Sequence, residues 1–216
     1  MMPLTASAAS KNPGKTKITS YKVGKYKAST NSAKVTIKWK KAKKATGYII
    51  YGKHGNGNWE KVKKVGRFKN GLIVKKVPAG YVSFRVQPIR KVKGKTYKGK
   101  MSGVKTKFIK STLSLEQYVN RFEPSLRNRN VNGAVVTFSG NNAILTFDYT
   151  NDPDFAGVNP NNISQAERNQ AYAELAELQG TANSFRSTIE ANTGIKGAGM
   201  TVVMKLKGVE LVRRSF

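Results

Sequence analysis

The fold of the first half of this chain is decided by residues 34–40, which read Lys-Val-Thr-Ile-Lys-Trp-Lys. Apolar residues alternate there with lysine or threonine, the period of two that marks a strand with one buried and one solvated face. The segment therefore predicts a strand that points Lys34, Lys38 and Lys40 to solvent and buries Trp39 in a core.

Further short segments of the same kind follow, separated by turn signals such as Asn56-Gly57. Strands are expected at residues 48–51, 59–65, 72–77, 82–86 and 99–109. Roughly seven short strands within about 95 residues indicate an all-β sandwich over residues 16–110.

Three segments of this half carry a resemblance to a known family. They are the strand that ends at Trp39, residues 45–51 (Ala-Thr-Gly-Tyr-Ile-Ile-Tyr) and residues 81–87 (Tyr-Val-Ser-Phe-Arg-Val-Gln). Together they resemble a fibronectin type III domain over roughly residues 16–109. The lysine-rich hairpin at residues 90–97 resembles the version found in surface proteins of Gram-positive bacteria, which implies a sandwich used for attachment.

One feature departs from that family, the tyrosine corner. The usual spacing from Pro78 puts Val82, and not Tyr81, at the tyrosine position. Either the turn is one residue short or the corner is lost.

The second half follows a helical rhythm. Capping boxes begin helices at Ser114 and at Ser164, with Gln117 and Glu167 three residues later, and Gly194 is expected to end the second, long helix. The strands are expected in two hairpins, residues 135–138 with 144–149 and residues 200–206 with 209–212. The order α-β-β-α-β-β indicates an α+β domain over residues 111–216, an antiparallel sheet with helices on one side.

This half resembles the bacterial family called domain of unknown function 4854. The resemblance rests on residues 113–119 (Leu-Ser-Leu-Glu-Gln-Tyr-Val), on residues 145–149 (Leu-Thr-Phe-Asp-Tyr), and on a long alanine-rich helix followed by a terminal strand pair. It implies a fold and a frequently exported context, not an activity.

Charge separates the two halves sharply. Residues 1–110 hold 27 Lys and 3 Arg against one acidic residue, Glu60, so they carry the whole formal net charge of +29. Residues 111–216 hold 10 basic and 10 acidic residues. Such a change in composition indicates two domains, with a junction near Lys110 and Ser111.

The chain has no cysteine and no run of 18 apolar residues, which excludes thiol chemistry and a membrane-spanning helix. Residues 1–15 are expected to be a disordered N-terminus. Within them, Ala6-Ser7-Ala8 fits the small-x-small cleavage pattern of a secretory signal, although the regions that should precede it are missing. The pattern favours export, and the alternative is an ordinary N-terminus.

Residues able to do chemistry are scarce. His54 is the single histidine and is expected to be a solvated turn residue, since a lone histidine makes neither a metal cluster nor a triad. Asp148, Asn151, Asp152 and Asp154 have oxygen ligands for calcium but not the spacing of a known calcium loop, which favours turn and cap roles. The sequence thus predicts no catalytic residue, no metal and no cofactor.

The lysines carry the functional prediction. Thirty bases against one acid exceed what solubility requires and favour contact with a polyanion. Because an ammonium group is a point charge without the planar fork of arginine, the attraction is expected to be diffuse. The predicted contacts are Lys34, Lys38, Lys40, Lys91, Lys93, Lys95, Lys98 and Lys100.

Two classes of function remain open. The first is a non-catalytic, secreted or cell-surface binding module that attaches to anionic cell-wall polymers or glycans of a Gram-positive bacterium. The alternative is a nucleic-acid-binding protein without sequence specificity, which needs exposed aromatic residues among its bases for stacking. Tyr51, Trp59 and Tyr97 are the candidates for that role, and edge packing is the competing interpretation.

Overall fold

The structure is a computed structural model that describes residues 11–216, so the cleavage pattern at residues 6–8 lies outside the described residues. It contains two compact units that divide between Ile109 and Lys110, one residue before the division expected from the sequence. No helix within residues 11–216 has the length and apolar character needed to cross a bilayer.

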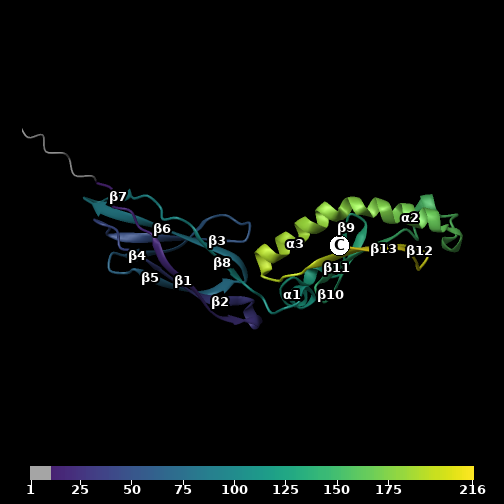
Figure 1. Cartoon of the computed structure of the whole chain (residues 1–216), viewed down its shortest axis with the longest axis horizontal. Coiled ribbons are helices and arrows are strands. Elements are labelled where there is room, and N and C mark those ends of the chain that lie inside the picture. Colours follow the sequence, from purple (N-terminus) through teal and green to yellow (C-terminus); the bar gives the residue numbers. More distant parts are fainter. Residues whose placement is uncertain (1–10) are drawn as a thin grey trace, which may run out of the picture. The chain divides into compact units, whose positions relative to one another are not determined.

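The first unit is a sandwich of two antiparallel sheets (Figure 1). One sheet has the strand order β1-β2-β5, and the other has the order β4-β3-β6-β7, with β8 also paired to β6. The elements are β1 (Ile18–Lys27), η1 (Ala28–Thr30, a 3-10 turn), β2 (Ser32–Trp39), β3 (Gly47–His54), β4 (Glu60–Gly66), β5 (Gly71–Pro78), β6 (Gly80–Val92), β7 (Lys95–Lys98) and β8 (Lys105–Ile109).

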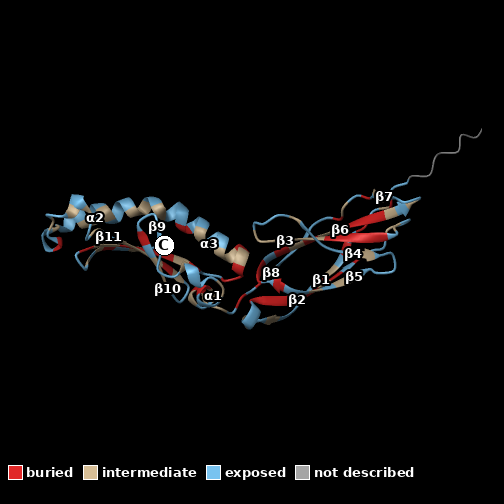
Figure 2. Ribbon diagram, turned by 180° about the vertical axis from the view of Figure 1, so that it is seen from behind, coloured by how far each residue is buried: buried red, intermediate tan, exposed pale blue. Residues whose placement is uncertain are grey.

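The core of the first unit lies between the two sheets, and Figure 2 shows buried residues of β2 and β6 in red. Trp39 is 1% exposed and its ring lies 5.6 Å from that of Tyr48, so its predicted place in the core is confirmed. The hydroxyl of Tyr21 on β1 donates a hydrogen bond of 3.1 Å to the Val82 carbonyl on β6 and ties the sheets together.

One expectation for the strands needs correction, and one open alternative is decided. The closing strand is only β8, because Gly99 and Gly103 interrupt the segment before it and Ser102 bonds to both backbone groups of Val86. At the position of the tyrosine corner, Val82 points into the core, while Tyr81 is exposed and packs against the ring of Phe108. The corner is therefore lost at this position.

The disordered N-terminus expected over residues 1–15 extends too far, because residues 11–15 are ordered against the sandwich. Residues 11–15 are described, Pro13 is buried, and the Gly14 amide donates a hydrogen bond of 2.9 Å to the Lys43 carbonyl. The reason is a close fit, because a Cβ added at Gly99 would lie 2.9 Å from the Pro13 ring.

The second unit has one five-stranded sheet in the order β13-β12-β11-β10-β9. Its strands are β9 (Arg129–Val131), β10 (Ala134–Ser139), β11 (Asn142–Asp148), β12 (Gly199–Leu206) and β13 (Val209–Ser215). The predicted antiparallel sheet is wrong, since β11 and β12 pair in parallel and make the sheet mixed. A helical crossover joins these two strands. Because it returns the chain to the end of the sheet where β11 began, the next strand runs parallel to β11.

Both helical segments cover the same face of this sheet, where Leu145 belongs to both apolar clusters. The two predicted capping boxes, at Ser114 and Ser164, are present, and Gly194 ends the second helix with φ of 74°. The helical elements are α1 (Leu115–Phe122), η2 (Pro124–Leu126), η3 (Pro153–Phe155), η4 (Pro160–Asn162), α2 (Gln165–Glu174), η5 (Leu175–Leu178) and α3 (Gln179–Thr193). The predicted long helix thus contains one 3-10 turn between α2 and α3.

Candidate polyanion-binding surface

The lysine side chains of the first unit point to solvent. All eight lysines named from the sequence are exposed, and within residues 11–109 every lysine except the half-buried Lys53 is exposed. On β2 the cause is the strand period, which turns Lys34 and Lys38 away from the core side of Trp39.

These lysines also lack partners inside the protein. Among the described residues, no lysine side chain of the first unit makes a hydrogen bond or an ion pair, and the ion pairs that do occur, Glu190 with Lys196 and Glu210 with Arg213, lie in the second unit. Glu60, the single acid of the first half, cannot neutralise so many cations. Their charge is therefore available to an external anion.

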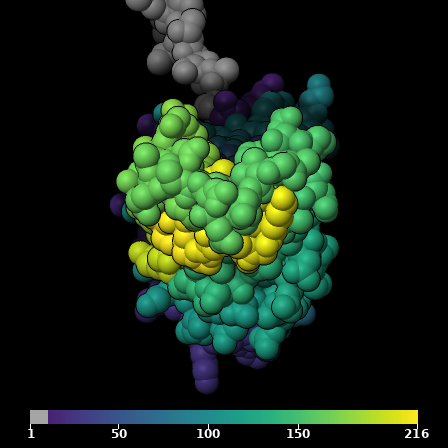
Figure 3. Space-filling model, turned by 90° about the vertical axis from the view of Figure 1, so that its right-hand side faces the viewer, coloured from purple at the N-terminus to yellow at the C-terminus, as the bar shows by residue number. Residues whose placement is uncertain are grey.

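Two cations of the second unit, Arg168 and Lys207, have a different role. Arg168 donates hydrogen bonds to the carbonyls of Pro160 and Leu211, and the Lys207 ammonium donates to the carbonyls of Ala156 and Val158. Figure 3 shows this end of the unit, where yellow C-terminal strands lie against green segments. These cations hold loops in place, so they contribute little to an external binding surface.

Three loops and the N-terminal segment of the first unit meet at one end of the sandwich. The Trp39 amide donates to the Asn70 carbonyl at 2.9 Å, and the Thr46 amide donates to the Ile89 carbonyl at 2.8 Å. These bonds bring the β2–β3 loop beside the β4–β5 loop and the β6–β7 hairpin. In Figure 1 the arrowhead of β6 and strand β7 mark this end.

We call this region the basic end. Its exposed cations come from segments far apart in the sequence, namely Lys40, Lys41, Lys43, Lys44, Arg67, Lys69, Lys91, Lys93 and Lys95. Glu60 pairs with Gly52, toward the opposite end of β3. The basic end therefore contains cations and no acidic side chain, which attracts anions and repels other cations.

The predicted site residues are divided by the fold. Lys40, Lys91, Lys93 and Lys95 meet at the basic end, and Lys98 and Lys100 follow behind the tip of the hairpin. Lys38 and Lys34 lie on the outer face of the three-stranded sheet, and Lys34 is toward the opposite end of β2. Strand periodicity could not find the loop members of the basic end, since loops have no period.

The three aromatic candidates, Tyr51, Trp59 and Tyr97, are half-buried rather than fully exposed. The Arg85 guanidinium lies 4.2 Å from the Trp59 ring centre and 5.7 Å from that of Tyr51. The Tyr51 hydroxyl also donates to the Gln87 side chain at 3.4 Å. An internal cation thus covers part of the ring surface that a stacked base would need.

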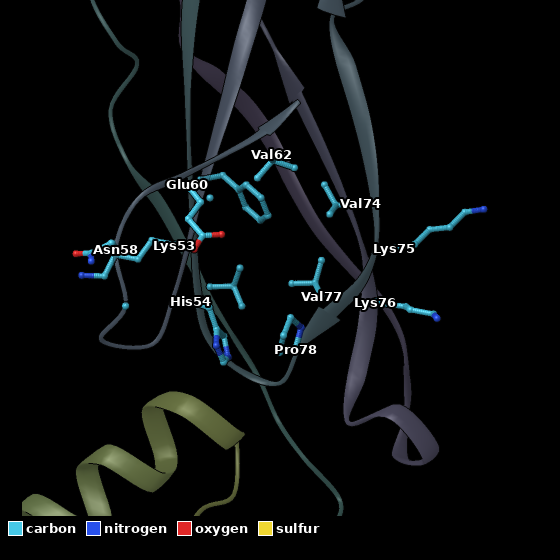
Figure 4. Close-up of a pocket in the computed structure, with 14 residues that line it drawn as sticks. Lys53, His54, Asn58, Glu60, Val62, Val74, Lys75, Lys76, Val77 and Pro78 are labelled. Carbon is cyan, nitrogen blue, oxygen red and sulfur yellow. The ribbon is translucent and has the colours of Figure 1, made fainter. Parts of the chain in front are cut away.

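A cleft of about 440 Å³ opens between the edge strands β4 and β5 (Figure 4). Val62, Val74 and Val77 point into it, whereas Lys75 and Lys76 point away. His54 is not simply solvated as expected, because its Nε2 donates a hydrogen bond of 2.7 Å to the Ala79 carbonyl. This bond holds the end of β3 against the β5–β6 turn, a structural role.

The acidic residues considered for calcium bond to their own loop. Asp148 accepts hydrogen bonds from the amide and hydroxyl of Thr150, which hold the pKa of its carboxyl below the usual value, and Asp152 caps η3 through the Asp154 amide. Within residues 11–216 no three His, Cys, Asp or Glu side chains are grouped to hold a metal ion.

Comparisons with known proteins inform the fold alone. No protein-family model and no curated protein matches the chain, so the resemblance to domain of unknown function 4854 stays a prediction. A solved myokine structure is 12% identical, with a TM-score of 0.33 over 43% of this chain and 95% of the other. An FN3 domain of human collagen XX is 15% identical, with a TM-score of 0.29 over 49% of this chain and all of the other. The chain is thus similar to FN3 domains over about half its length.

Proposed function

We propose that the first unit is a non-catalytic binding module that attaches to a polyanionic polymer through diffuse electrostatic contact. The observation that supports this most is the basic end, where nine exposed cations from separate segments gather without an acidic neighbour. Like charges at this density repel each other, so the arrangement costs stability unless an external anion is bound.

Binding would be driven by the release of counterions from the polymer. Each cation that neutralises a polymer charge displaces a condensed counterion, which makes the affinity fall steeply as salt rises. Most contributing side chains are lysines, whose point charges recognise anions without reading a base sequence. The second unit, whose net charge is zero, would then be free to contact something else.

We further propose that the protein works outside the cell, on the surface of a Gram-positive bacterium, where anionic wall polymers and glycans are the polyanions. Support comes from the sequence resemblances of both halves and from the cleavage pattern at residues 6–8. The half-buried state of Trp59 and Tyr51, with Arg85 against both rings, favours this reading over base stacking.

The test measures binding of the full chain to purified cell wall, an anionic polysaccharide and duplex DNA across a salt series. A double variant, Lys43→Gln with Lys91→Gln, removes two charges from the basic end. Its matched control, Arg127→Gln with Arg129→Gln, removes two exposed charges from the second unit.

Log affinity should fall linearly with log salt, and the slope should drop by about 0.7 to 0.9 for each contacting cation removed. At about 0.1 M salt the basic-end variant should then bind roughly 25-fold to 60-fold more weakly if both lysines contact the polymer. The control should change little. Salt-independent binding, or equal losses in both variants, would contradict the proposal, and a strong preference for DNA would favour the nucleic-acid alternative.

A further inference from the structure

The outer face of the three-stranded sheet contains an irregularity at Lys34, toward the opposite end of β2 from Lys40. Between the pairs Val23–Val35 and Tyr26–Ala33, two residues of β1, Gly24 and Lys25, oppose Lys34 alone. Two residues opposite one define a β-bulge, which bends its strand and redirects side chains.

A second bulge faces Lys34 from the other side. Between the pairs Val35–Val74 and Ala33–Val77, Lys75 and Lys76 of β5 also oppose Lys34 alone. One lysine on the middle strand is thus flanked at the same level by two bulges, and both bulges contain lysine. Regular strands would space these charges along the sheet, whereas the two bulges concentrate them.

A pocket of about 440 Å³ lies over this point. Five lysines line it, Lys25, Lys27, Lys34, Lys75 and Lys76, and the turn between β1 and β2 adds the exposed hydroxyl residues Ser29 and Thr30 to its wall. Gly24 contributes no side chain to the wall, so the space above the sheet remains open. Five lysines and three hydroxyl residues, Ser29, Thr30 and Ser32, therefore border one small concave site.

Lys76 has a backbone that lysine seldom adopts. Its φ is 54°, in the left-handed region that costs a residue with a Cβ about 1 to 2 kcal/mol. Glycine or asparagine would adopt the same backbone in this bulge at lower cost, and would not add a further positive charge beside Lys34. Strain and like-charge repulsion at the same residue indicate that the charge itself has a use.

We infer that this bulge pocket binds a phosphate group of the polyanion. A phosphate is a compact oxyanion with several acceptor oxygens, so lysines from three strands that line one pocket can share it, and lysine recognises phosphate as a point charge. A carboxylate has fewer oxygens to share among several ammonium groups. The inference rests on the proposed function and deepens it, because it makes a phosphate-bearing polymer the preferred partner over a carboxylate-bearing one.

The variant that tests this pocket is Lys34→Gln with Lys76→Asn, in the full chain. Asparagine tolerates the left-handed backbone, so the second change removes charge without adding strain. The control, Lys95→Gln with Lys93→Asn, is matched in charge and in backbone conformation, since Lys93 is exposed, has φ of 46° and lies in the same unit outside the pocket. Lys76→Asn alone is a second variant that does not alter the middle strand.

Inorganic phosphate is the first probe. It is titrated into the protein at constant ionic strength, and binding is monitored through the NMR signals of the backbone amides. Amides of Gly24, Lys34 and Lys76 should shift and saturate in the wild type and in the control, and should not saturate in the pocket variants. Shifts that stay linear in phosphate for the wild type, or saturation that survives in the pocket variants, would overturn the inference.

Polyphosphate and polyglutamate are the second pair of probes. Each lost phosphate contact weakens binding about fivefold to eightfold at about 0.1 M salt, so the pocket pair should lose roughly 25-fold or more for polyphosphate and clearly less for polyglutamate. The control pair should affect both polymers equally. Equal losses for the pocket pair and the control pair, with both polyphosphate and polyglutamate, would reject the pocket but keep diffuse binding. Absence of salt-dependent binding to either polymer in the wild type would reject the proposed function.

Discussion

Replacing Trp39 by alanine should remove a large part of the stability of the first unit. The side chain is 1% exposed, and burial of roughly 200 Å² of aromatic surface at about 25 cal/mol/Å² contributes about 5 kcal/mol. The lost ring contact with Tyr48 adds about 1 kcal/mol.

One feature of Trp39 reduces this figure. Its indole Nε1 is buried without a hydrogen-bond partner, which already costs the native state about 1 to 3 kcal/mol and is relieved in the variant. The expected net loss is therefore about 4 kcal/mol, within the usual range for a large aromatic residue. Trp39→Phe, which removes the N–H but keeps a ring, should lose far less.

Tryptophan fluorescence can measure this in the full chain, because both tryptophans of the protein lie in the first unit and Trp59 remains in each variant. A loss of about 4 kcal/mol should lower the melting temperature of this unit by roughly 15 to 30 °C. Circular dichroism of the helices in the second unit serves as the internal control. A loss below about 1 kcal/mol would refute the placement of Trp39 in a tightly packed core.

Three further outcomes follow from single contacts. Tyr21→Phe should destabilise the first unit by about 1 kcal/mol, measured by the same fluorescence melt, because it removes the hydrogen bond from the Tyr21 hydroxyl to the buried Val82 carbonyl. Ser114→Ala should cost the second unit about 1 kcal/mol in a dichroism melt, since it removes the capping box of α1, and an unchanged melt would argue against that box. Hydrogen bonds lower the pKa values of Asp148 and Glu210 in the folded state. The stabilisation that these two ionised carboxylates give is therefore present above about pH 4.5, the ordinary pKa of Glu, and disappears as the pH falls through their pKa values in the folded state. The second unit should therefore lose stability between pH 5 and pH 3, and a melting temperature unchanged over that range would contradict this sign.

Much of the local structure could be predicted from the sequence because its causes are local. Alternation of apolar residues and lysine is enough to place β2 and to bury Trp39. Capping boxes at Ser114 and Ser164 mark helix starts because side chain and backbone satisfy each other within four residues. The bulges in β1 break the alternation, which explains why that strand was not predicted.

The remaining features depend on how distant segments meet. Strand β9 is exposed along its whole length and has no apolar pattern to reveal it. The residues of β11 and β12 do not themselves determine whether the two strands pair in parallel. The helical crossover between them was an available signal for parallel pairing. Similarly, Lys43 and Lys91 become neighbours at the basic end only through the register of the strands that lead to their loops.

The parallel pairing of β11 with β12 has a consequence for the growing chain during synthesis. All strands of the first unit lie within residues 18–109, so that unit can be complete while the second is still being made. Strand β11 ends at Asp148 and its partner begins at Gly199, so about fifty residues must be added, which takes roughly 3 to 10 s at usual translation rates. During this time the edge of β11 is open to strands of other chains. Like charges repel, so the net charge of +29 on residues 1–110 opposes the approach of one such nascent chain to another.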